Sequence, residues 1–317
     1  MQNLRLLFCF TILVTIAISG CNKNDFVENE QIEIIRDEFG VPHIYAPTDE
    51  LVAYGLGWAQ CEDDFITIQE QMAAIKGVFG EIKGMDGLVA DFAIKFMGIK
   101  DYTKKHYQEL SPKMRLIIKH FVKAVNTYAD SYPKLVLDAD IFPIENEVAA
   151  AGFMLGLVEI TGATADLQNI MEGKISKYVK SNFPKGSNAI AMNPSITNTG
   201  ETYLAINSHQ PLEGWYSWYE AHLVSEEGLN IHGGTFPGGC VIFHGANQNF
   251  GWAHTVNHAD FSDVYKLEMH PEKPLTYKHD DEWLELEEIN HWSWMQLIGA
   301  LAIPIKRTIY KLSLIHI

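Results

Sequence analysis

The sequence has few cysteines and few basic residues for its length. Its 317 residues include 4 cysteines, and 24 lysines and arginines stand against 40 aspartates and glutamates, which gives a net charge of −16. Proteins that bind nucleic acid gather positive charge on the contact surface, and the sequence contains no basic cluster of that kind. Nucleic acid is therefore not expected as a partner.

The sequence also lacks the His-Glu-x-x-His motif of zinc hydrolases. His254 and His258 are four residues apart and His244 is nearby, and imidazole is a preferred zinc ligand. However, the run from Gly251 to Val256 is predicted as a strand, and a zinc site there needs a further ligand from elsewhere. Zinc is not expected.

The apolar run near the N-terminus, Leu6 to Ile18, is too short to span a bilayer comfortably. It follows Arg5 and precedes small residues, so residues 1–20 are predicted to be a secretory signal. Ile18-Ser19-Gly20-Cys21 resembles the lipobox of bacterial lipoproteins. That resemblance implies a lipid on Cys21 and an anchor in the cell envelope, at the periplasm or outer membrane. An ordinary cleaved signal is the alternative.

Export would place Cys61 and Cys240 in an oxidising compartment. They either pair or stay as separate thiols, and their spacing does not decide between the two.

The rest of the composition is that of a globular protein, with 47% hydrophobic and 20% charged residues. A strand is predicted from Gln31 to Arg36, and an extended segment from Val41 to Ala46 follows a turn. Thr48 is expected to cap a helix that runs to about Ile75. Two further helices are predicted behind Ser111-Pro112 and from about Glu145 to Glu159.

Gly55 and Gly57 fall inside the first of these helices. A glycine costs about 1 kcal/mol in a helix interior, so the pair predicts close packing against another backbone.

The central stretch begins at Gly186-Ser187-Asn188, at the start of a predicted β-run. A second run follows from Thr202 to Ile206 and ends near His209. If the Gly186–Ser187 bond were cut, Ser187 would carry a free α-amine with a pKa of about 7.7–8.0 beside its own hydroxyl. Such an amine is able to activate the hydroxyl as a nucleophile. Gly-Ser-Asn is also common in ordinary loops.

Several separated blocks of sequence resemble the penicillin acylase family of N-terminal-nucleophile hydrolases, over residues 32 to 278 or so. The blocks include Arg36 to Ala46, Tyr54 to Gln60, Ser187 to Ala189, Trp218 to Leu223 and Gly251 to Asn257. His209 and the last block are most similar to the branch of acyl-homoserine-lactone acylases and aculeacin A acylase. The resemblance implies an α+β fold, the αββα sandwich of Ntn hydrolases, and a precursor that cuts itself between Gly186 and Ser187.

The resemblance also implies the parts of the chain and their roles. Residues 21–173 would form a small helical chain, 174–186 a processing segment, and 187–317 the start of a large chain, the two chains forming a heterodimer. Ser187 would be the nucleophile and its amine the base. His209 would position Ser187, and the backbone amide of Val256 would donate to the oxyanion.

Other residues of the family's site would lie downstream of this sequence. A second oxyanion donor and a charged partner for the histidine belong to the part of the large chain that follows in relatives. We therefore expect the 317 residues to be a fragment of a longer precursor.

Three aspartates fall where relatives place ligands of a structural Ca²⁺. They are Asp166, Asp260 and Asp263, and carboxylate oxygens suit this cation. Two aspartates on a surface loop are more commonly just solvated. No cofactor is expected for catalysis.

The expected function is hydrolysis of a linear amide between an acyl chain and an amine, such as an acyl-homoserine lactone, a lipopeptide or a β-lactam. Aromatic residues from Trp215 to Tyr219 are expected to pack in the core and in part to line an acyl pocket. The alternative is a lipid-anchored binding or structural protein without turnover, or an inactive fragment of an acylase precursor.

Overall fold

The computed structural model describes residues 31–161, 167, 169, 173, 186–256, 264–298 and 301–312. The chain separates into Met1–Glu30 and Gln31–Ile317 by its internal contacts, and all described residues lie in the second unit. The predicted signal and Cys21 fall outside them. None of the helices in the described ranges combines the length and the hydropathy of a membrane span.

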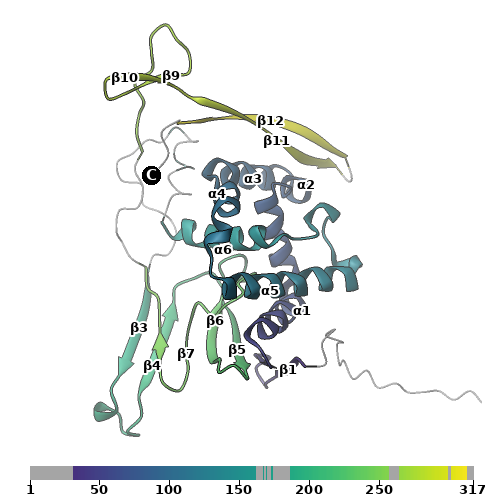
Figure 1. Ribbon diagram of the computed structural model, residues 1–317, viewed down its shortest axis with the longest axis vertical. Helices are drawn as coiled ribbons and strands as arrows, with labels where there is room; N and C mark the ends of the chain where they lie inside the picture. Colours follow the sequence, from purple (N-terminus) through teal and green to yellow (C-terminus); the bar gives the residue numbers. More distant parts are fainter. Residues whose placement is uncertain are drawn as a thin grey trace, which may run out of the picture. The chain divides into compact units, whose positions relative to one another are not determined.

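A six-stranded sheet joins the two halves of the sequence (Figure 1). Its strand order is β1-β2-β5-β6-β7-β8. Strands β2 and β5 pair in parallel, and all other neighbouring strands of this sheet pair antiparallel. Because β2 precedes Ser187 and β5 follows it, strands from both sides of the proposed cut share one sheet. The strands are β1 Glu33–Arg36, β2 Pro42–Ala46, β5 Tyr219–Ser225, β6 Asn230–Thr235, β7 His244–Ala246 and β8 Gly251–Trp252.

Helix α1, Asp49–Lys76, packs against this sheet and against α5. Its predicted cap is confirmed, since the Thr48 hydroxyl accepts from the amide of Leu51 at 3.4 Å. The close packing against another backbone predicted for its two glycines is confirmed at Gly57, whereas Gly55 is packed closely against side chains instead. A Cβ on Gly55 would lie 2.6 Å from the Ile44 side chain, and one on Gly57 would lie 2.8 Å from the Phe121 carbonyl oxygen.

The other helices lie around α1. The Ser111 hydroxyl accepts from the Met114 amide at 3.1 Å and begins α5 as predicted. Buried Asp91 of α3 accepts from the amides of Phe79 and Gly80, which fixes the turn before α2. The helices are α2 Gly80–Lys83, α3 Met85–Met97, α4 Ile99–His106, α5 Pro112–Ser131 and α6 Asn146–Thr161, with 3₁₀ turns at Tyr107–Glu109, Pro133–Leu135, Ala139–Ile141 and Pro194–Ile196.

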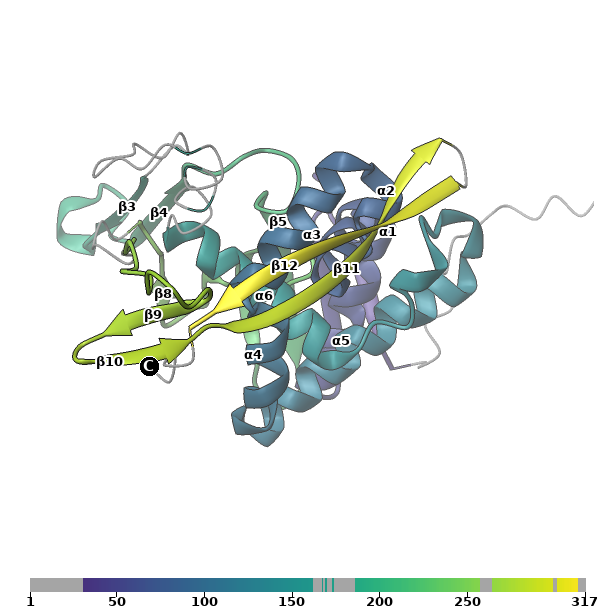
Figure 2. The same ribbon diagram turned by 90° about the horizontal axis from the view of Figure 1, so that it is seen from above.

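Three antiparallel hairpins complete the described strands. The third of them, β11–β12, passes over α2 and α3 (Figure 2), and β11 contacts both helices. The strands are β3 Ser187–Met192 with β4 Tyr203–Ser208, β9 Thr276–His279 with β10 Glu282–Glu285, and β11 Glu287–Ile298 with β12 Leu301–Lys311. Helices and mainly antiparallel strands confirm the α+β class.

One predicted strand is shorter than expected. The sequence predicts a strand from Gly251 to Val256, but only Gly251–Trp252 pairs with a neighbouring strand, as β8. Its partner β7 has three residues, and Trp252 lies opposite Gly245. With so short a partner the ladder ends there, and residues 253–256 continue without strand pairing.

Candidate active site around Ser187

Ser187 is the first residue of β3, and the β3–β4 hairpin places it opposite Ser208. Gly186, just before it, has φ +147°, a backbone conformation that residues with a Cβ rarely adopt. The glycine therefore allows a backbone conformation, just before Ser187, that other residues would adopt only with strain.

The Ser187 hydroxyl lies beside the carbonyl group of Gly186. Its Oγ donates to the Gly186 oxygen at 2.5 Å and accepts weakly from the backbone amide of His209 at 3.4 Å. Ser187 is partly exposed, so water has access to the same bond. The hydroxyl is thus next to the carbonyl that a self-cleavage reaction would attack.

The imidazole of His209 lies over Gly186. A Cβ on Gly186 would be 3.2 Å from His209 Nδ1. The side-chain amides of Asn188 and Asn207 approach Nε2 at 3.1 and 3.5 Å. Amide nitrogens donate, so Nε2 accepts and the proton of the neutral ring is on Nδ1, the atom that faces Gly186.

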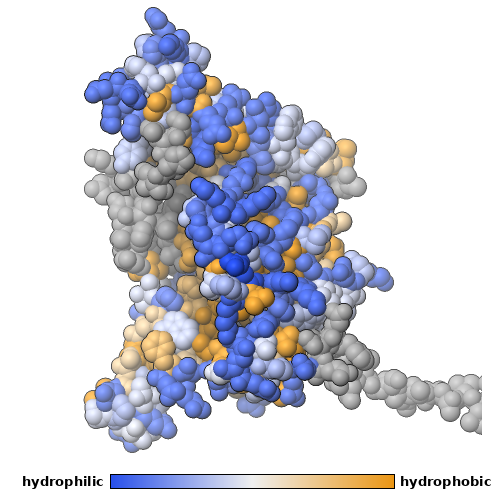
Figure 3. Space-filling model, in the orientation of Figure 1, coloured by the Kyte–Doolittle hydropathy of each residue, from blue (hydrophilic) through white to orange (hydrophobic). Residues whose placement is uncertain are grey.

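An open cavity of about 490 Å³ runs along this hairpin. Its lining mixes the Ser187 hydroxyl and asparagine amides with apolar side chains, and Ile190 in it is 57% exposed. Ile190, Met192, Ile196 and Tyr203 of this hairpin are exposed. Figure 3 shows hydrophobic and hydrophilic residues side by side over the region of β3 and β4. The cavity residues are Ser187, Asn188, Ala189, Ile190, Ala205, Asn207 and Thr255.

Val256, the proposed oxyanion donor, directly follows Thr255, which lines this cavity. The structure therefore brings Ser187 and His209 together and places the segment that bears Val256 at the same cavity. Sequence reasoning missed Asn188 and Asn207 as partners of His209, because their convergence depends on the register of the hairpin.

The proposed calcium ligands Asp166, Asp260 and Asp263 lie outside the described residues, as does His258. In the ranges that are described, no group of three or more His, Cys, Asp or Glu side chains is already placed to hold a metal ion together. His244 stacks on Trp218 with ring centroids 4.0 Å apart, and the ring of His254 lies tilted beside that of Phe243 with centroids 4.4 Å apart. Burial, together with His254, lowers the pKa of His244, so these rings belong to an aromatic cluster.

Cys61 and Cys240 are free thiols. Cys61 is buried in α1, and burial raises the pKa of the Cys240 thiol to about 12. The thiolate is the nucleophilic form of cysteine. Neither side chain is therefore suited to the role that the sequence assigns to Ser187.

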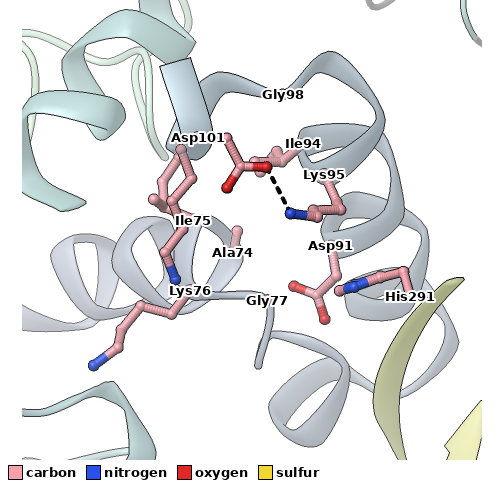
Figure 4. Close-up of a pocket in the computed structure, with 11 residues that line it drawn as sticks. Ala74, Ile75, Lys76, Gly77, Asp91, Ile94, Lys95, Gly98, Asp101 and His291 are labelled. Atoms are coloured by element: carbon pink, nitrogen blue, oxygen red, sulfur yellow. Dashed lines mark hydrogen bonds and ion pairs between the residues drawn. The ribbon is translucent and has the colours of Figure 1, made fainter. Parts of the chain in front are cut away.

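A second cavity, about 180 Å³, shares no lining residue with the first (Figure 4). Lys95 and Asp101 pair across it at 2.7 Å, and Asp91 and His291 face each other on its other side. Burial raises the pKa of Asp91 to about 7 despite its two backbone donors. No hydroxyl or thiol lines this cavity, so it offers no serine or cysteine nucleophile.

Comparison with known proteins identifies relatives for most of the chain. The family model described as penicillin amidase matches residues 31–292. Acyl-homoserine lactone acylase PvdQ of Pseudomonas fluorescens is 25% identical over 310 residues, which cover 88% of this chain and 40% of that protein. Aculeacin-A acylase of Actinoplanes utahensis is 24% identical over 286 residues, 78% of this chain and 36% of that protein.

Penicillin G acylase of Escherichia coli is 28% identical over 102 residues, 32% of this chain and 12% of that protein. The chain thus spans about 40% or less of the length of these relatives.

Proposed function

Because the chain belongs to the penicillin amidase family, we propose that it is part of an acylase that hydrolyses the amide bond between an acyl chain and an amine. The observation that carries the proposal is the contact of Ser187 Oγ with the Gly186 carbonyl beneath the ring of His209. The proposed enzyme class is that of hydrolases of linear amides.

The first step would be self-cleavage. Ser187 Oγ attacks the carbonyl carbon of Gly186 and forms a C–O bond, while the hydroxyl proton passes to the amide nitrogen of Ser187. The C–N bond then breaks and leaves an ester between the two residues. Water hydrolyses the ester, which gives a carboxylate on Gly186 and frees both the hydroxyl and the α-amine of Ser187.

The second stage is turnover of the substrate. The α-amine of Ser187 accepts the hydroxyl proton through a water molecule, and Oγ attacks the substrate carbonyl. The amine product leaves with a proton, and water then hydrolyses the acyl ester. The amide of Val256 would donate to the oxyanion, a contribution of about 2.7–4 kcal/mol for one such donor.

His209 would act on Ser187 by position. Its Nε2 accepts from the asparagine amides, so Nδ1 carries the proton, and Nδ1 lies on the side of Gly186 where a Cβ would stand. A ring in this tautomer donates a hydrogen bond and is not a base at Nδ1. Proton acceptance is therefore assigned to the Ser187 amine.

Contacts across the cut support a two-chain product that stays together. Gln60 donates to the Gly239 carbonyl at 2.9 Å and accepts from the Gly238 amide at 2.8 Å. The Tyr219 hydroxyl donates to Asp63 at 2.7 Å. With the β2–β5 pairing, these bonds would hold a small and a large chain as a heterodimer.

The apolar side chains in the Ser187 cavity favour an aliphatic acyl group as substrate. An acyl-release assay on N-acyl-homoserine lactones of graded chain length, with the protein produced from its natural gene, tests this. We expect release that depends on chain length and is lost in Ser187→Ala. Release of the same rate from Ser187→Ala would contradict the proposal.

We also propose export through residues 1–20 and a lipid on Cys21, on the strength of the lipobox resemblance. Labelling with radioactive palmitate should mark the wild-type protein and not Cys21→Ser. A labelled Cys21→Ser protein would show that the lipid, if any, is elsewhere.

A structural Ca²⁺ on Asp166, Asp260 and Asp263 remains part of the proposal because their carboxylates suit that ion. Removal of calcium with a chelator should lower the melting temperature, and added Ca²⁺ should restore it. A melting temperature unchanged by the chelator would exclude this site.

A further inference from the structure

Three histidines lie side by side on neighbouring strands of the six-stranded sheet. His43 of β2 is in register with His222 of β5, and His222 is in register with His232 of β6. Residues in register on paired strands present their side chains on the same face of the sheet. The side chain of His43 is 29% exposed and that of His232 is 52% exposed.

The first two rings meet nitrogen to nitrogen. His43 Nδ1 lies 2.9 Å from His222 Nδ1, with the rings nearly perpendicular at 86°. At that distance a positive centre has to lie between the two nitrogens unless one of them donates a hydrogen bond to the other.

The other nitrogen of each ring has an acceptor beside it. His43 Nε2 lies 3.5 Å from Asp37 Oδ2, and an ionised carboxylate only accepts. The Asp37 carboxylate is held in place by the amides of Phe39 and Val41, each at 2.9 Å. His222 Nε2 lies 2.9 Å from Asn230 Oδ1.

These partners favour the same tautomer in both rings. A proton on Nε2 of each ring satisfies the hydrogen bond to Asn230 at 2.9 Å and the ion pair with Asp37 at 3.5 Å, and both Nδ1 atoms then present lone pairs to each other. Histidines that bind a metal ion show this pattern, because the nitrogen that does not ligate donates to a carboxylate or a carbonyl.

We propose that His43 and His222 bind a divalent transition-metal ion such as Zn²⁺ through their Nδ1 atoms. Zn–N bonds are about 2.0–2.1 Å long and the coordination is tetrahedral, which puts two ligand nitrogens about 3.3 Å apart. The two Nδ1 atoms lie 2.9 Å apart, so the rings would have to separate by only a few tenths of an ångström to admit the ion. Water would complete the coordination, and His232 is the nearest further imidazole, with its ring centroid 6.0 Å from that of His222.

His232 is at present paired with Glu220, its Nε2 lying 2.9 Å from the carboxylate. A turn of its side chain toward His222 would make it a third ligand at the cost of that exposed ion pair, which is worth little in water. The site therefore has two ligands in place and a third one strand away.

A metal ion at this position would link two segments that are far apart in the chain. His43 precedes Ser187 and His222 follows it, so the ion would connect the segments on either side of the proposed cut. This part of the inference rests on the proposed self-cleavage, whereas the binding of the metal does not.

The test is titration of Zn²⁺ into the untagged protein, followed by calorimetry, with His43→Gln, His222→Gln and His232→Gln as variants. His279→Gln is the matched control, because His279 is also exposed beside a carboxylate, that of Asp280 at 3.8 Å, but lies on a separate hairpin. We expect one ion per chain in the wild type and in the control. Affinity should fall at least tenfold in His43→Gln and His222→Gln and by a smaller factor in His232→Gln.

Copper offers a readout that does not depend on stability. With Cu²⁺, electron paramagnetic resonance should show coupling to two or more nitrogens in the wild type, lost in His222→Gln. Equal affinity in wild type and in the two variants would overturn the proposal. So would the absence of binding, which would mean that Asn230 donates to His222 through its amide nitrogen and that His222 Nδ1–H donates to His43.

The structural role has its own experiment. If the site connects two chains, Zn²⁺ should raise the concentration of urea needed to separate them in the cleaved protein. In Ser187→Ala, which would stay in one piece, Zn²⁺ should still bind with wild-type affinity. If Ser187→Ala did not bind Zn²⁺, metal binding would depend on self-cleavage, which would contradict the independence of the two.

Discussion

The Nδ1 atom of His209 lies so close to Gly186 that a Cβ there would be 3.2 Å away. Such a distance is tighter than most contacts of a Cβ atom, and the backbone of Gly186, with φ +147°, is strained for any other residue. Glycine is therefore required at this position for two separate reasons, the backbone and the ring beside it.

Gly186→Ala is thus expected to slow self-cleavage by about tenfold or more. The new side chain would cost on the order of 1–3 kcal/mol in the present backbone conformation, so the backbone would relax out of it and carry the Gly186 carbonyl away from Ser187 Oγ. The rate is measured on a denaturing gel after synthesis. Gly200→Ala is the control, since Gly200 also has a positive φ, +71°, in the same hairpin but has no neighbour within reach of a Cβ. Cleavage of Gly186→Ala at the rate of the control would contradict this account.

Asn188→Ala is expected to slow self-cleavage by about fivefold. The variant removes the closer of the two amides at His209 Nε2, and a hydrogen bond contributes about 1 kcal/mol. Thr199→Ala, which removes an exposed hydroxyl that contacts Tyr203 in the same hairpin, should cleave normally. If both variants cleave alike, the amide does not orient the ring.

Replacing a helical glycine by alanine is expected to change the free energy of unfolding in opposite directions at two positions. Gly57→Ala should lower the free energy of unfolding by about 1–3 kcal/mol, because the new Cβ would meet the Phe121 carbonyl oxygen at 2.8 Å. Gly156→Ala in α6 should raise it by up to about 1 kcal/mol, since the nearest atom there is 3.8 Å away and alanine favours helix. Urea unfolding measures both, and a stable Gly57→Ala would show that α1 and α5 are less tightly packed.

Asp91 is expected to make stability fall as the pH rises. Burial raises its pKa in the folded protein to about 7 from an ordinary value of 3.8. Between these values the folded state binds more protons than the unfolded state, so the free energy of unfolding decreases with pH and levels off above 7. The expected decrease is on the order of 2 kcal/mol, less than the full effect of the pKa change, because the folded site would relax.

The matched variant is Asp91→Asn, which resembles the protonated acid at every pH. Urea unfolding at pH 5 and pH 8 should differ less for this variant than for the wild type. An equal difference in both proteins would place the pH dependence on other groups.

The sequence was a good guide where the determining contacts are local. The cap at Thr48, the glycines of α1 and the helix start at Ser111 all depend on neighbours within a few residues or on the absence of a Cβ. The convergence of Asn188 and Asn207 on His209 was not predictable, because it follows from the register of β3 with β4.

The pairing of strands that are far apart in the chain was also not predictable from the sequence. The parallel contact of β2 with β5 joins residues 179 positions apart at His43 and His222, and neither strand carries a signal for the other. The carboxylate of Asp91 is buried by a turn that follows α1. In a helical pattern alone, an aspartate at that position is indistinguishable from a solvated one.

The most direct test is the N-terminal sequence of the larger fragment, determined for the protein produced from its natural gene. The account predicts two fragments, the larger beginning at Ser187, and a single uncut chain for Ser187→Ala. A protein that hydrolyses acyl amides while its Gly186–Ser187 bond stays intact would contradict the central claim.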